Sequence, residues 1–78
     1  MLMDAYRSSD TYEIALLFIS GFRVIDTHRN GPRVTFVFEN GDRCREVIKQ
    51  YLCHELRIDA REYVDGIRTV KAMAYACK

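Results

Sequence analysis

The residues best suited to chemistry in this sequence are three cysteines and two histidines. Cys44 falls on an apolar helical stripe, so we expect it to be a small core residue rather than a nucleophile. Cys53 lies about 180° around the same predicted helix and is expected to be exposed. Cys77 stands next to the last residue, and we expect it to be mobile. A reactive or dimer-linking thiol at Cys53 stays open as an alternative.

The spacing of the histidines gives no catalytic pattern. His28 comes just before a predicted turn, and His54 lies near a helix end, where a protonated imidazole is favourable. A zinc site needs a closely spaced pair of ligands and a fourth donor, which the sequence lacks. No catalytic triad spacing, phosphate-binding glycine loop or H-E-x-x-H motif occurs. We therefore predict no metal, no cofactor, no catalytic residues and a protein that is not an enzyme.

The basic residues offer a different chemistry, since nine of the twelve are arginine. The planar guanidinium suits phosphates, carboxylates and aromatic faces. One group lies on a predicted hairpin and another on one flank of the last predicted helix, a pattern that suits nucleic acid. Asp65, at helical spacing from Arg61 and Arg68, favours instead an ordinary solvated flank. The candidate contacts for nucleic acid or a partner are Arg23, Arg29, Arg33, Arg61, Arg68, Lys71 and Tyr75.

Composition limits the classes of protein. The 78 residues suffice for one domain, and 49% hydrophobic content suffices for one core. A formal charge of +1 argues against bulk-charge binding to nucleic acid and against a polybasic membrane anchor. The longest apolar run, residues 14–19, is far shorter than the roughly 20 residues of a membrane span. With no apolar run typical of an export signal and few cysteines, we expect a cytoplasmic protein with reduced thiols.

A first helix is predicted over about ten residues after Asp10. Asp10 and Glu13 have the spacing of a capping box, and Gly21 supplies the left-handed residue after the helix. Residues 1–9 are predicted to be a frayed lead-in.

Residues 22–28 and 33–39 are predicted to form a hairpin. A two-residue Asn30-Gly31 turn would split the large apolar side chains between both faces, whereas a three-residue loop over 29–31 gathers them on one. We prefer the latter, which puts Ile25 opposite Thr35 and Arg23 opposite Val37. The expected inner face is Phe22, Val24, Val34, Phe36 and Phe38. The outer face then presents the candidates for self-association, Ile25, Thr35 and Val37.

Two further helices complete the chain. The second begins near Asn40 or Asp42 and carries the clearest amphipathic stripe, Cys44, Val47, Ile48, Tyr51, Leu52 and Leu56. The third begins at Asp59, and Gly66 in its middle either packs closely on a neighbour or lies at the surface. The prediction is a single α+β domain over residues 1–78, with a two-stranded antiparallel hairpin on three helices in the order α-β-β-α-α.

The sequence resembles a family of small uncharacterised bacterial and phage-associated domains. The resemblance rests on Ala15-Leu16-Leu17-Phe18, Gly21-Phe22-Arg23-Val24-Ile25-Asp26, Val34-Thr35-Phe36-Val37-Phe38, Tyr51-Leu52 and Lys71-Ala72, within residues 12–75. It supports the order of elements and implies no activity. We expect a non-catalytic binding module in contact with a protein partner or a second copy through the hairpin. The alternative is a nucleic-acid-associated accessory protein with an arginine-rich surface.

Overall fold

The structure, a computed structural model, describes residues 4–77. Its elements are β1 (Ala5–Ser8), α1 (Thr11–Ile19), β2 (Val24–Asn30), β3 (Arg33–Glu39), α2 (Gly41–Leu52) and α3 (Ala60–Ala76). The α+β class and the three helices are confirmed. The sheet, however, has three strands in the order β1-β3-β2, so the element order is β-α-β-β-α-α rather than α-β-β-α-α.

The additional strand corrects the prediction of a frayed lead-in. Ala5–Ser8 pairs antiparallel with β3, placing Tyr6 opposite Phe38 and Ser8 opposite Phe36. Four residues are too short for a periodic sequence pattern, and the strand forms because β3 offers an edge that needs a partner. Residues 1–3 of the predicted lead-in lie outside the described residues.

The predicted hairpin register is also wrong. Asn30 pairs with Arg33, so the loop is the two-residue Gly31-Pro32, with Gly31 at a φ of +65°. A glycine of positive φ at the first central position is typical of a type II′ turn. The pairing puts His28, not Ile25, opposite Thr35, and a bulge at Ile25 then shifts the register. Because the bulge restores the alternation, Val24 and Phe38 still face the core beside Phe36.

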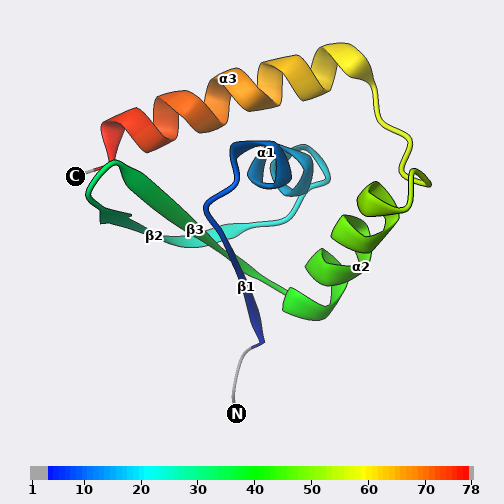
Figure 1. Cartoon of the computed structure of the whole chain (residues 1–78), viewed down its shortest axis with the longest axis horizontal. Coiled ribbons are helices and arrows are strands. Elements are labelled where there is room, and N and C mark those ends of the chain that lie inside the picture. The colour runs from blue at the N-terminus through cyan, green and yellow to red at the C-terminus, as the bar shows by residue number, and fades with distance from the viewer. Residues whose placement is uncertain (1–3, 78) are drawn as a thin grey trace.

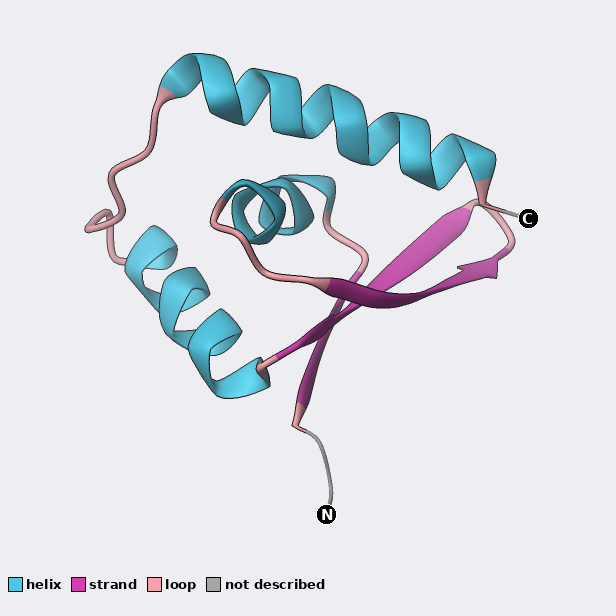
Figure 2. Cartoon of the chain, turned by 180° about the vertical axis from the view of Figure 1, so that it is seen from behind, coloured by secondary structure: helices cyan, strands magenta, loops and turns pink. Residues whose placement is uncertain are grey.

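Helix α1 lies between the sheet and α3, with α2 closing one side (Figure 1). Seen from behind, the three helices leave the opposite face of the sheet uncovered (Figure 2). Residues 14–17 of α1 are all buried, because the helix contacts other elements on several sides. Gly66 of α3 is buried against α1, where a Cβ would lie 2.5 Å from Ile19 Cγ2. Close packing is therefore the reason for a glycine within this helix.

Local hydrogen bonds explain the ends of the helices. Asp10 caps α1 by accepting from the Tyr12 and Glu13 amides, and Asp59 caps α3 by accepting from the Glu62 amide. Gly21, at a φ of +91°, ends α1 as predicted. The side chain of Glu13 does not complete a capping box, because its Oε1 accepts from Tyr6 Oη at 2.9 Å and Ser8 Oγ at 3.1 Å. Glu13 thus fastens β1 to α1.

Candidate functional site

The structure brings some of the predicted basic residues close together and leaves others far apart. The turn between β2 and β3 lies beside the end of α3 (Figure 1). A groove between the turn and the helix is lined by Arg29, Lys71 and Tyr75 among others. Arg33 belongs to the same turn. Arg23 precedes β2 and is roughly 20 Å from the turn. Arg61, in the first turn of α3, is likewise roughly 20 Å from Tyr75.

Arg29 has a structural task at this junction. Its Nε donates to the carbonyl of Cys77 at 2.8 Å, and its Nη2 donates to the carbonyl of Ala74 at 2.8 Å. Its Nη1 donates to Gly31 O at 3.1 Å, within the hairpin turn. A cation that bonds the last carbonyls of a helix also opposes the negative end of the helix dipole. Arg29 therefore holds the end of α3 against the hairpin with three of its five N–H groups.

The two segments that meet at this junction contain no carboxylate side chain. Residues 27–38 of the hairpin and residues 66–78 contain neither aspartate nor glutamate. We call residues 28–35 together with residues 66–77 the basic end. Within residues 4–77, neither Arg33 nor Lys71 takes part in a salt bridge. Tyr75 is 91% exposed and lines the same groove as Lys71. The basic end thus combines uncompensated positive charge with an accessible aromatic ring.

The N-terminal half of α3 differs, because its arginines have partners. Arg61 Nε lies 3.7 Å from one carboxylate oxygen of Asp65, and Arg68 Nη1 lies 3.9 Å from the other. These exposed pairs contribute little stability, but they place a negative charge between the two arginines. The predicted helical flank is therefore not one uniform basic stripe.

The uncovered sheet face offers less apolar surface than predicted. Val37 is only 5% exposed, since it lies on the central strand opposite Arg7 and Asp26. Thr35 is half-buried, and its Oγ1 lies 2.7 Å from Ser9 Oγ. Ile25, at the bulge, remains 42% exposed. Of the three residues predicted for self-association, only Ile25 presents an exposed apolar side chain.

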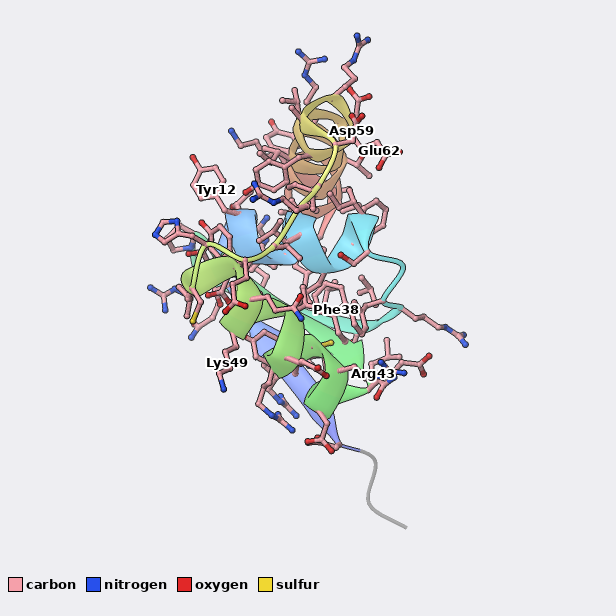
Figure 3. All side chains as sticks on the ribbon, turned by 90° about the vertical axis from the view of Figure 1, so that its right-hand side faces the viewer. Tyr12, Phe38, Arg43, Lys49, Asp59 and Glu62 are labelled. Carbon is pink, nitrogen blue, oxygen red and sulfur yellow. The ribbon has the colours of Figure 1, made fainter. Side chains whose placement is uncertain are left out.

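A surface that the sequence reasoning did not identify lies where α2 ends and α3 begins. Leu52 is 67% exposed, although it lies on the apolar stripe of the predicted second helix. Tyr12, in the predicted first helix, is 55% exposed. Figure 3 looks onto this side of the molecule, with Tyr12 at the surface and Phe38 inside. A groove beside them is lined by Tyr51, Leu52, His54, Leu56 and Arg57. We call Tyr12, Tyr51, Leu52, Leu56 and Ile58 the apolar end.

Tyr63 connects the elements that form the apolar end. Its hydroxyl donates to the backbone carbonyl of Tyr12 at 3.4 Å. Burial raises the pKa of Tyr63, with smaller contributions from Tyr51, Asp10 and Tyr12.

The sequence feature that could have revealed the apolar end is the length of the apolar stripe on α2. It continues through Tyr51 and Leu52 after Ile48, which is the last buried residue of that helix.

The cysteines and histidines take separate positions. Cys44 is fully buried, burial raises the pKa of its thiol, and its predicted core role is confirmed. Cys53 is exposed as predicted. Cys77, predicted to be mobile, instead packs on the core and caps α3 through its amide. His28 Nε2 lies 3.2 Å from Asp26 Oδ2 on the surface of the sheet.

His54 shapes the backbone at the end of α2. It adopts a left-handed φ of +61°, and its amide donates to Tyr51 O while the next amide donates to Gln50 O. These two bonds form a Schellman motif, in which glycine is the usual residue. The role of His54 in this structure is therefore conformational.

Across residues 4–77, the structure contains no cluster of three or more side chains suited to a metal ion. No helix of that part of the chain has the length and hydropathy to cross a membrane. Every buried polar side-chain atom described there has a hydrogen-bond partner.

Comparison with known proteins identifies a family and no close relative. No curated protein and no solved structure shows significant similarity to the chain. A family model matches residues 3–76, nearly the whole chain, and thereby confirms the resemblance to an uncharacterised domain. The chain belongs to the family described as a domain of unknown function, DUF5659.

Proposed function

We propose that the protein is a non-catalytic interaction module that self-associates through its apolar end. The observation that carries this proposal is the exposure of Leu52 and Tyr12 beside Tyr51, a cluster of large apolar side chains without cover. Such clusters on small proteins mark interaction surfaces. A second copy presents the same cluster, so one two-fold contact covers both at once.

This surface replaces the hairpin face as the favoured route to a dimer. The burial of Val37 and the hydrogen bond of Thr35 leave the hairpin face little to offer a second copy. At the apolar end, the groove beside Leu52 supplies a concave surface that can receive a side chain of the partner. The three unpaired cysteines support a reducing, cytoplasmic compartment.

Sedimentation equilibrium from micromolar to millimolar concentration tests the proposal. We expect a concentration-dependent dimer that Leu52→Glu converts to monomer, because a carboxylate would be buried in the contact. Gln50→Glu is the matched control, since it adds the same charge to an exposed position of the same helix. A wild-type monomer at millimolar concentration would contradict self-association. A dimer that persists in Leu52→Glu would contradict this surface.

A further inference from the structure

The groove at the basic end lies at the opposite end of α3 from the apolar end. A ligand in the groove therefore does not compete with self-association through the apolar end. Arg29, Pro32 and Val34 line it from the hairpin, and Lys71, Ala74 and Tyr75 line it from α3. The three bonds of Arg29 to Cys77, Ala74 and Gly31 hold the two walls together. The groove is therefore built by a tertiary contact rather than by one helix surface.

The charges around this groove favour an anionic ligand. Lys71 lies on one wall of the groove and Arg29 lies on the other. Neither has a salt-bridge partner in the described chain, and Arg68 lies one turn before Lys71. The nearest acidic side chain along α3 is Asp65, which Arg61 and Arg68 share. A phosphate at Lys71 would therefore meet positive charge without competing carboxylates.

The aromatic ring distinguishes among anionic ligands. Tyr75 is 91% exposed and stands one helical turn after Lys71, so its ring faces are open beside a cation. Aromatic rings bind unpaired bases by stacking, while neighbouring cations bind the backbone phosphates. Bases in a duplex are already stacked on each other and would leave this ring unused. An acidic peptide would use the cations but would gain little from the ring.

We propose that this groove binds single-stranded nucleic acid, with a phosphate at Lys71 and a base stacked on Tyr75. Arg29 acts here as a positioning residue, because three of its five N–H groups are bonded to backbone carbonyls. Arg23, Arg33 and Arg61, which the sequence grouped with these residues, do not line the groove and take no part.

Fluorescence anisotropy with a labelled oligothymidylate of about 12 nucleotides, at about 20 mM salt, tests the proposal. Binding should weaken as salt rises, with a log–log slope of about −0.7 for each phosphate contact on a single strand. Lys71→Gln combined with Tyr75→Ser should weaken binding by about tenfold or more. Lys49→Gln, an exposed lysine of α2, is the matched control and should change affinity by less than about twofold.

The remaining measurements distinguish a single-stranded ligand from a duplex and from an acidic peptide. Tyr75→Ser alone should weaken binding to the single strand but leave the salt slope unchanged, because stacking releases no counterions. A duplex of equal length and a polyglutamate peptide should bind more weakly than the single strand. The proposal is overturned by no binding at low salt, by equal losses in Lys49→Gln, or by tighter binding of the duplex or the peptide. Circular dichroism confirms that each variant keeps the fold.

Discussion

The two ends of α3 differ in their contacts with the rest of the molecule. At the basic end, Arg29 bonds the last carbonyls of the helix to the hairpin, and the polar backbone of that end is satisfied by a distant part of the chain. At the apolar end, α3 begins at an Asp59 cap, while Leu52 and Tyr51 across the 53–59 connection remain exposed. One end is closed by tertiary hydrogen bonds, and the other leaves apolar surface that no element within residues 4–77 covers.

The comparison teaches that exposure has different physical meanings at the two ends. Exposed cations at the basic end are stable in water and need no partner. Exposed leucine and tyrosine side chains at the apolar end remain unfavourable until they are covered, because apolar surface costs about 25 cal/mol per Å² in water. A partner at the apolar end would therefore be held by burial, and a ligand at the basic end by charge.

The largest effect is expected from Phe38→Ala, which should disable both ends together. Phe38 is fully buried on the central strand, so its truncation should destabilise the fold by about 3–5 kcal/mol. Urea denaturation measures the change. Ile25→Ala, at a position that is 42% exposed, is the control and should cost less than about 1 kcal/mol. Equal losses in the two variants would contradict the core assignment.

Arg29→Met should separate the two ends. It removes three hydrogen bonds from the basic end, and we expect a loss of about 1–2 kcal/mol because the bonds are charge-assisted but solvent-accessible. Hydrogen exchange should show faster opening at the C-terminal turn of α3 than at its N-terminal turn. Arg33→Met, at the exposed neighbouring arginine of the same turn, should leave that exchange unchanged. Uniform acceleration along α3 would show that Arg29 does not act locally.

Tyr6→Phe tests β1, which belongs to neither end. It deletes the hydrogen bond to Glu13 and should cost about 1 kcal/mol. Burial, followed by the bond to Glu13, raises the pKa of Tyr6 to about 12, from 10.0. Because the pKa of Tyr6 is raised in the folded protein, the contribution of Tyr6 to folding stability is complete below pH 10. That contribution is lost as pH rises through about 12.

Tyrosinate absorbance, recorded during a pH titration, checks this pKa. In the wild type Tyr6 should ionise near pH 12, and Tyr6→Phe should reduce the late absorbance step by one tyrosine. Tyr75→Phe is the control, since Tyr75 is 91% exposed and its loss should leave the late step in place. A late step of undiminished size in Tyr6→Phe would assign it to another residue.

The smallest effect is expected at the apolar end, from His54→Gly. Glycine adopts the left-handed backbone of this position without the steric cost that a side chain carries, so we expect stabilisation by about 0.5–1 kcal/mol. Thermal unfolding measures the shift. Cys53→Gly is the matched control, because Cys53 has a φ of −90° and glycine there should destabilise. A destabilised His54→Gly would mean that the imidazole itself contributes contacts.

Much of the fold could be predicted from local chemistry. Asp10, Gly21 and Asp59 mark helix ends because a cap depends on neighbouring residues alone. The buried position of Cys44 followed from helical periodicity. β1 could not be predicted, because a four-residue strand has no period and depends on an edge supplied by β3. The prediction of the hairpin register was wrong because the bulge at Ile25 has no local signature in the sequence.

The candidate surfaces were predictable to a lesser degree. Lys71 and Tyr75 were identified by residue type, but their groove requires the hairpin turn, which is far away in the sequence. Arg29 was identified for its charge, although its bonds to Cys77 and Ala74 give it a structural role. The exposure of Leu52 was missed, because periodicity indicates which residues share a face and not whether another element covers that face.

The sequence by itself determined the α+β class, the three helices with their caps, and the separation of charged from apolar residues. These depend on short-range hydrogen bonds and on the period of side-chain directions. Tertiary structure alone decided that a third strand completes the sheet, that Gly66 packs against α1, and that Arg29 joins the hairpin to α3. It also decided that the end of the α2 stripe stays uncovered, since burial depends on which elements meet.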